Sequence, residues 1–184
     1  VTATVTLNSY TLSVATAGTG GGTISSTPAG ISCGTACAAG FTHGTSVTLT
    51  AAPNGGSTFS GWSGGGCSGT GTCTVSMTSA TTVTATFTAN LYTLTVWRVG
   101  SGTVTSTPAG ITCATGCTST APVSAQYPYG TLVTLDANDT GLWFWSDWAG
   151  ACAGQWQSCT LTIDQNLSTN AIFTRDTGCN PICP

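Results

Sequence analysis

Cysteine is the residue whose number and spacing point most directly to chemistry in this chain. Five close pairs account for all ten cysteines: Cys33 and Cys37, Cys67 and Cys73, Cys113 and Cys117, Cys152 and Cys159, and Cys179 and Cys183. Such spacing suits either a local disulfide or part of a zinc site, but zinc needs four ligands in one place. Because each pair lies on a separate predicted loop, we expect five local disulfides, no metal site and an oxidising compartment outside the cell.

Few other residues are able to do chemistry. His43 is the only histidine and lies in a predicted turn, where the later part of the chain has Tyr129. All five carboxylates are Asp, and all lie in the second half of the sequence. A hydrolase needs a base beside its nucleophile, and glycoside hydrolysis needs paired carboxylates. The sequence therefore predicts a protein that is not an enzyme and that uses no cofactor.

One stretch has the spacing of a calcium-binding loop. Asp136, Asn138 and Thr140 occupy positions 1, 3 and 5, Gly141 occupies position 6, and Asp147 occupies position 12. No helices are predicted on either side, and the first half of the chain has Ala-Pro-Asn-Gly-Gly in the same place. We therefore expect an ordinary turn here.

Charged residues make up only 4% of the chain, and two arginines are its only strong cations. Two cations cannot neutralise a run of phosphates, so nucleic acid and anionic membranes are not expected partners. No apolar run is long enough for a membrane-spanning helix, and the absence of a leader pattern predicts a mature secreted chain. A surface of Thr, Ser and Gly gives little protection against self-association.

The chain contains an internal repeat that organises it into two modules. STPAGISC, ending at Cys33, recurs as STPAGITC, ending at Cys113, and CTVSM from Cys73 recurs as CTLTI from Cys159. The offset is 80 residues at the first motif and about 86 after Cys117, so the second copy has an insertion before Gly130. We predict an extra strand at 1–8, modules at 9–90 and 91–176, and a tail at 177–184 joined by its own cysteine pair.

Both modules show the period-two alternation of half-buried strands. Val83, Ala85 and Phe87, for example, alternate with threonines, and Gly-rich breaks such as AGTGGG supply turns. No helical period of useful length is present. The fold is therefore predicted to be mostly β.

The first six residues, VTATVT, resemble the last strand of module 1, VTATFT at 83–88. Three interpretations remain open for this extra strand. It adds to the edge of module 1, it inserts into a neighbouring subunit by strand addition, or it is the remnant of a longer repeat array. In the second case the side chains of Val1, Ala3 and Val5 fill apolar sites of the neighbour.

The motifs PAGIxC, GWSGG followed by Cys, and the closing TATF together resemble the divergent InlB B-repeat, a small module of bacterial surface and secreted proteins. The resemblance covers both modules. It implies a β-grasp-like mixed sheet, an extracellular location, and an adhesive, spacer or structural role without catalytic residues.

Aromatic residues are the last candidate site. Phe59 and Trp62 match Trp145 and Trp148 and are predicted to lie in the two cores. Module 2 has further aromatics without aromatic counterparts in module 1, which suits a larger private core, a subunit contact or a carbohydrate platform. As subunit contacts we assign Trp97, Tyr127, Tyr129, Trp143 and Trp156, together with the first strand.

The sequence as a whole predicts an extracellular structural protein that self-associates. The favoured interpretation is a subunit of a bacterial surface filament or adhesive appendage, assembled by β-strand addition. The alternative is a carbohydrate-binding or spacer module of a secreted enzyme, with a polysaccharide as its partner.

Overall fold

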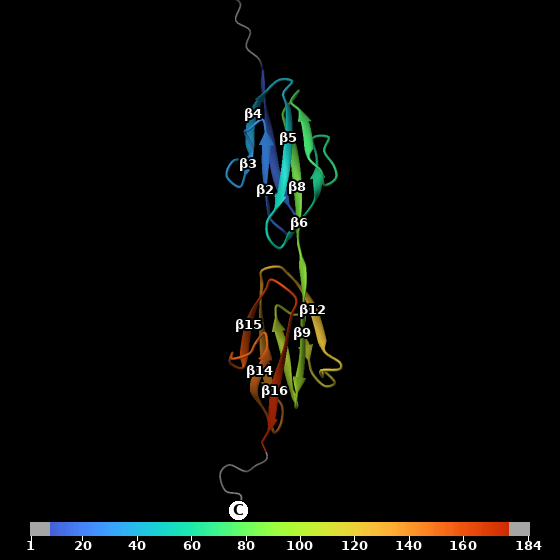
Figure 1. The fold of residues 1–184 in the computed structure, drawn as a ribbon, viewed down its shortest axis with the longest axis vertical. Helices are drawn as coiled ribbons and strands as arrows, with labels where there is room; N and C mark the ends of the chain where they lie inside the picture. Colours follow the sequence, from blue (N-terminus) through green and yellow to red (C-terminus); the bar gives the residue numbers. More distant parts are fainter. Residues whose placement is uncertain (1–7, 177–184) are drawn as a thin grey trace, which may run out of the picture. The chain divides into compact units, whose positions relative to one another are not determined.

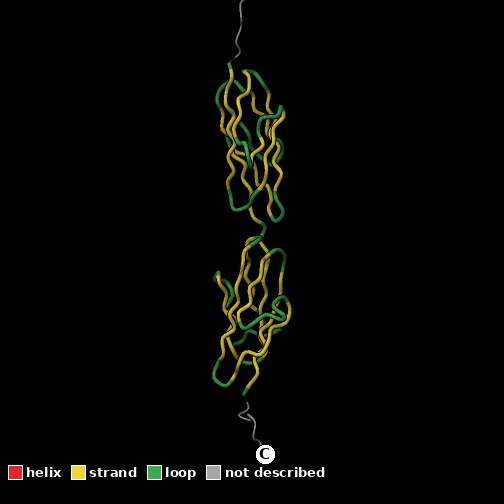
Figure 2. Tube along the Cα trace, turned by 90° about the vertical axis from the view of Figure 1, so that its left-hand side faces the viewer, coloured by secondary structure: helices red, strands yellow, loops and turns green. Residues whose placement is uncertain are grey.

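A computed structural model describes residues 8–176, which form sixteen β-strands in two compact units that meet between Asn90 and Leu91 (Figure 1). Strands and the loops between them account for all of this part of the chain (Figure 2). It contains no helix long and apolar enough to span a membrane. The mostly β fold in two tandem modules is thereby confirmed, while the predicted strand at 1–8 and the tail at 177–184 fall almost wholly outside the described residues.

Module 1 consists of two four-stranded sheets. The mixed sheet runs in the order β4 (Ala38–Thr42), β1 (Ser9–Ala17), β8 (Thr81–Ala89) and β6 (Ser57–Ser63). The antiparallel sheet runs in the order β3 (Ser32–Cys33), β2 (Gly22–Thr27), β5 (Ser46–Pro53) and β7 (Cys73–Ser76). The first and last strands of the module are parallel neighbours in the centre of the mixed sheet, so the closing strand holds the fold together.

Module 2 repeats this topology strand for strand. Its mixed sheet has the order β12 (Val123–Pro128), β9 (Leu91–Val99), β16 (Leu167–Arg175) and β14 (Trp143–Gly150). Its antiparallel sheet has the order β11 (Thr112–Cys113), β10 (Gly102–Thr107), β13 (Thr131–Asp139) and β15 (Ser158–Ile163). The mixed sheet that the family resemblance implies is therefore present in both modules, accompanied by a second sheet.

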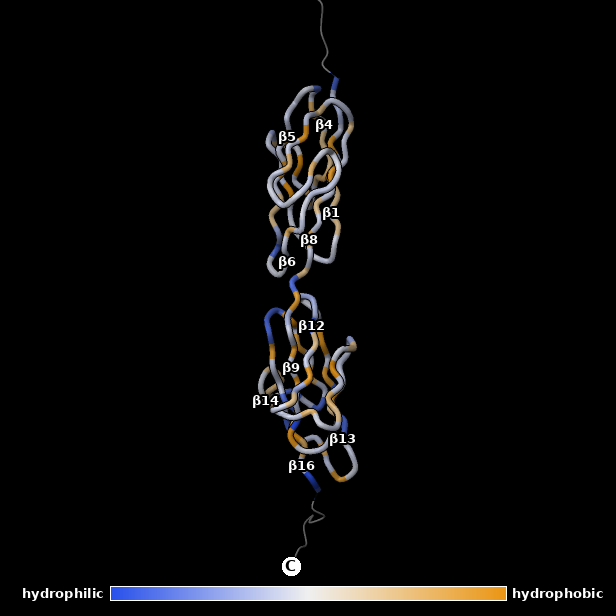
Figure 3. The backbone as a smooth tube through the Cα atoms, turned by 90° about the vertical axis from the view of Figure 1, so that its right-hand side faces the viewer, coloured by the Kyte–Doolittle hydropathy of each residue, from blue (hydrophilic) through white to orange (hydrophobic). Residues whose placement is uncertain are grey.

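Each module has one core, to which both sheets contribute alternate side chains. In module 1, Leu12 from β1, Leu49 from β5 and Phe87 from β8 are all fully buried in a single cluster. Apolar and polar residues alternate along the strands of both modules, as Figure 3 shows in orange and white. Two sheets that each present one apolar face bury those faces against one another, which gives a β-sandwich.

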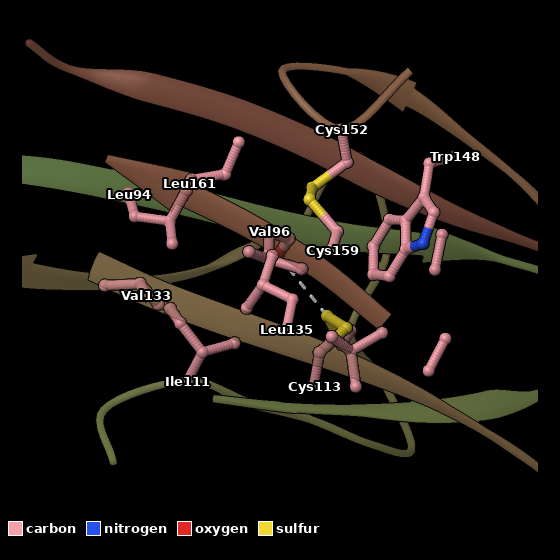
Figure 4. Packing of buried hydrophobic residues seen from close by; sticks show 14 of the residues in the cluster. Leu94, Val96, Ile111, Cys113, Val133, Leu135, Trp148, Cys152, Cys159 and Leu161 are labelled. Atoms are coloured by element: carbon pink, nitrogen blue, oxygen red, sulfur yellow. Dashed lines mark hydrogen bonds between the residues drawn. A yellow bond between two sulfur atoms is a disulfide. The ribbon is translucent and has the colours of Figure 1, made fainter. Parts of the chain in front are cut away.

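The cores follow the aromatic assignments made from the sequence. Trp62 and Trp148 are buried, and Phe59 and Trp145 pack against the two clusters as partly buried residues. Figure 4 shows Trp148 beside the disulfide between Cys152 and Cys159 in the core of module 2. These matched aromatic positions therefore belong to the interior of the modules.

The STPAG motif forms the same turn in both modules. In module 2 the Ser106 hydroxyl donates to the Pro108 carbonyl at 2.8 Å and accepts from the Ile111 amide at 2.9 Å. Ser26 makes the equivalent bonds to Pro28 and Ile31 in module 1. One serine thus satisfies two backbone groups where the chain turns, which explains why the motif recurs.

Candidate functional site

Disulfides join four of the five predicted cysteine pairs. The described bonds link Cys33 to Cys37, Cys67 to Cys73, Cys113 to Cys117, and Cys152 to Cys159. The predicted bond between Cys179 and Cys183 lies outside the described residues. Within residues 8–176 no group of three or more metal-ligating side chains gathers in one place, and every cysteine there is in a disulfide. The sulfur chemistry of this part of the chain is therefore cross-linking of short loops.

His43 packs against a ring at the end of module 1. Its imidazole lies 5.8 Å from the Tyr10 ring, edge to face, and its backbone N–H donates to the Asn8 carbonyl at 2.7 Å. Tyr129 holds the same place in module 2, at 6.2 Å from Tyr92. An aromatic contact common to both modules is thus the role that the structure gives His43.

The stretch with calcium-like spacing is a strand rather than the expected turn. Asp136 and Asn138 belong to β13, where Val133, Leu135 and Ala137 alternate with them and are buried. Only residues 141 and 142 form a turn, between the bridged residues Thr140 and Trp143. Asp139 accepts a hydrogen bond from the Trp145 amide at 2.6 Å, and Asp147 accepts one from the Trp148 amide at 2.7 Å. A calcium loop curls back so that all its oxygens converge on one ion. The extended backbone of β13 instead spaces Asp136 and Asn138 along the sheet, and Asp139 and Asp147 accept backbone amides.

The Asp147 contact explains a difference between the two modules. A β-bulge interrupts β6 at Phe59–Gly61 and β14 at Trp145–Asp147. In module 1 the Trp62 amide at this bulge donates to the Gly69 carbonyl at 2.9 Å. The Asp147 carboxylate supplies the acceptor in module 2, so the charged residue replaces a loop carbonyl.

The aromatics assigned to subunit contacts fall into three groups. Tyr127 is 4% exposed and its hydroxyl lies 2.9 Å from the Ser106 hydroxyl, so it serves the core, and its assignment as a contact was wrong. It also has an aromatic counterpart, because Tyr127 pairs with Tyr92 as Phe41 pairs with Tyr10.

Trp97 and Trp143 are partly buried against the core. Tyr129 is 43% exposed and Trp156 is 85% exposed. Val1, Ala3 and Val5 lie outside the described residues.

A polar groove lies on the antiparallel sheet of module 2. One of its lining residues, Gln157, directly follows Trp156 in the chain. The groove has a volume of about 400 Å³ and is lined by Thr105, Asp136, Ala137, Asn138, Gln157 and Ser158. Sequence reasoning missed this set, although the alternation in TLVTLDAND predicts that Asp136 and Asn138 share a face with Thr134. The other lining residues come from neighbouring strands and could not be placed beside them without the strand order.

Comparison with protein families identifies the first module. Residues 10–91 match the family model described as the divergent InlB B-repeat domain. Residues 10–91 are therefore similar to a divergent InlB B-repeat. The matched residues run from the first residues of β1 to the start of β9, so the InlB B-repeat corresponds to the whole sandwich of module 1. No curated protein sequence matches the chain.

Three solved structures are similar to this chain at very low sequence identity. The Bacillus anthracis TIE protein matches with a TM-score of 0.50 and 8% identity over 92% of this chain. This chain spans only 34% of the TIE chain. Two pilins match at lower TM-scores. GBS52, the minor pilin of Streptococcus agalactiae, gives 0.35 at 8% identity, covering 95% of this chain and 99% of its own. The major pilin T-13 of Streptococcus pyogenes gives 0.37 at 10% identity, covering 94% of this chain and 98% of its own.

Proposed function

We propose that this chain is a non-enzymatic, extracellular structural protein, a subunit of a bacterial surface filament or adhesive appendage. The observation that carries the proposal is the direct succession of strands between modules. The last strand of module 1, β8, ends at Ala89, and the first strand of module 2, β9, begins at Leu91. A chain in which one sandwich leads into the next through a single residue is suited to building tandem arrays.

Disulfides and composition support a place outside the cell. Four short-range disulfides fix loops within the two modules, and such bonds persist in oxidising compartments. The outer faces of the antiparallel sheets carry rows of hydroxyls, among them the contact of 2.9 Å between the Oγ1 atoms of Thr134 and Thr160. Close approach of such surfaces desolvates few charges, which favours assembly.

Strand addition is the mechanism of assembly that we propose. The sequence VTATVT at 1–6 resembles β8, in which Val83, Ala85 and Phe87 are fully buried. Each described module already contains its own closing strand, so a further strand of this type has to use the edge of a sheet. The mixed sheet of module 1 ends at β4 and β6. Backbone hydrogen bonds to such an edge would hold the neighbouring subunit.

The test compares the full chain with a form that lacks residues 1–7, by sedimentation and electron microscopy. The truncation keeps Asn8, whose carbonyl accepts the His43 amide, so module 1 should remain folded. We expect the full chain to form filaments and the truncated form to stay monomeric. The substitution Val5→Asp should also prevent assembly, whereas Thr4→Asp should affect it far less, because neighbouring residues of an added strand would face opposite ways. Filaments from the truncated form would refute strand addition.

A further inference from the structure

We propose that module 2 also carries a binding site for a neutral saccharide, formed by Asp136, Asn138, Gln157 and Ser158 beside Trp156. This inference does not depend on filament assembly. It assigns a ligand class to the polar groove on the antiparallel sheet.

The polar side chains of the groove come from adjacent strands and are held in place. Thr105 of β10 and Ser158 of β15 flank Asp136 of β13 on its two sides. The Ser158 hydroxyl donates to Oδ1 of Asp136 at 2.6 Å, and the Gln157 amide donates to the Ala137 carbonyl at 2.8 Å. Within residues 8–176 no hydrogen bond occupies Oδ2 of Asp136 or Oδ1 of Asn138. Fixed planar groups with free acceptors suit the paired hydroxyls of a sugar ring.

Trp156 directly precedes Gln157 of the groove lining, and its ring is the apolar platform of the proposed site. Its side chain is 85% exposed, the most exposed of the large apolar residues described. Its backbone is anchored, because the Trp156 carbonyl accepts the indole N–H of the buried Trp148 at 2.8 Å. The disulfide between Cys152 and Cys159 closes the loop that carries it. A large aromatic ring held at the surface can stack on the C–H face of a sugar, and its exposure is otherwise unfavourable.

The charge of the groove selects among saccharides. Asp136 is the only charged residue in its lining, so uronic acids, sulfated sugars and phosphates would meet a like charge without a compensating cation. A neutral sugar offers hydroxyl donors to the carboxylate instead. The class of ligand that fits is therefore a neutral oligosaccharide.

Module 1 lacks the site, which provides an internal comparison. Thr50 pairs with Ser25 as Asp136 pairs with Thr105, and Ala52 pairs with Thr23 as Asn138 pairs with Thr103. The carbonyl that accepts the buried indole N–H of Trp62 belongs to Gly71, in the place of Trp156. Module 1 thus has Thr50, Ala52 and Gly71 in the places of Asp136, Asn138 and Trp156. None of the three offers the carboxylate, amide or aromatic ring of the proposed sugar site.

The experiment is isothermal titration of the oxidised full chain with cellohexaose, N-acetylchitohexaose and mannohexaose, and with hexagalacturonate as the anionic control. We expect at least one neutral hexasaccharide to bind with a dissociation constant below about 5 mM, and hexagalacturonate not to bind. Trp156→Ala and Asp136→Thr, the latter copying module 1, should each weaken binding by about tenfold or more.

Two controls separate binding from folding. Leu142→Ala removes another exposed apolar side chain, 58% exposed and outside the groove lining, and should leave the affinity unchanged. All variants should keep the thermal midpoint of the parent. The proposal is overturned if none of the three neutral hexasaccharides binds, if the anionic one binds equally well, or if binding survives both groove substitutions. Loss of self-association in Trp156→Ala, without any sugar binding, would make the surface a subunit contact and would also overturn it.

Discussion

The substitution Gly22→Ala tests the packing of the two sheets in module 1. A Cβ at Gly22 would lie 2.2 Å from Cε1 and 2.4 Å from Cζ of Phe87, and 2.8 Å from the Ala52 carbonyl oxygen. Phe87 is fully buried and lies in the centre of the mixed sheet. Carbon atoms pack best at about 3.5 Å or more, so the ring would have to retreat by about 1.3 Å.

The size of the expected loss in stability follows from the confined position of the Phe87 ring. Overpacking a well-filled core costs about 1–3 kcal/mol, and the short contact places this case near the upper end. Gly22 does not have a positive φ, so alanine fits the backbone and recovers about 0.5 kcal/mol of unfolded-state entropy. We expect a net loss of about 2 kcal/mol in the free energy of unfolding of module 1.

Hydrogen exchange read by mass spectrometry is the assay, because peptides report each module separately. Amides of β2, β5 and β8 should exchange about 30-fold faster in Gly22→Ala, while those of module 2 should be unchanged. Gly55→Ala is the matched control, since a Cβ there meets nothing within 4 Å. Its effect should remain within about 0.5 kcal/mol.

A double variant identifies the contact itself. Phe87→Leu shortens the side chain that blocks the new methyl group, so Gly22→Ala with Phe87→Leu should cost less than the sum of the two single changes. If Gly22→Ala is as mild as Gly55→Ala, or if the double variant shows no coupling, then Phe87 does not pack over β2 and the description of the sandwich is wrong.

Three further changes in module 2 can be measured by urea unfolding of the oxidised chain. Ser106→Ala removes the acceptor of the Ile111 amide and should cost about 1–3 kcal/mol; a change below about 0.5 kcal/mol would contradict the role of the turn. Asp147→Ala removes the acceptor of the Trp148 amide and should cost about 1–2 kcal/mol, whereas Asp147→Asn, which keeps Oδ1, should cost less than half as much; equal losses would show that the hydrogen bond is unimportant. Trp148→Phe removes an indole N–H that is hydrogen-bonded, and it should lower the free energy of unfolding by more than about 2 kcal/mol. The buried indole N–H of Trp145 has no partner within residues 8–176, so Trp145→Phe should lower it by less than about 1 kcal/mol. The reverse order would refute the assigned contacts.

Alternation and repeats predicted the strand character of the fold, its two modules and several of its buried faces. Val83, Ala85 and Phe87 lie on the buried face of one strand as their spacing indicates, and the matched tryptophans Trp62 and Trp148 lie in the cores. Period two shows which face of a strand is buried, but it does not show which strands are neighbours. The pattern therefore could not predict that β8 lies between β1 and β6 in the mixed sheet.

The candidate site was predicted less well, for identifiable reasons. The calcium-like spacing of the stretch that begins at Asp136 led to the prediction of a turn. The alternation of the apolar residues Leu135 and Ala137 instead continues β13 through Asp136. Tyr127 was taken as unmatched because the insertion before it hides its register with Phe41. The groove depends on three strands that are distant in sequence, and only the sheet order brings Thr105 beside Asp136.

Electron microscopy of the oxidised full chain, with its sedimentation coefficient measured on the same sample, tests the account most directly. Strand addition predicts filaments that disappear when residues 1–7 are removed, leaving folded particles of a single subunit. Uniform 18.2 kDa monomers from the full chain at high concentration would contradict the proposal that this protein is an assembling subunit.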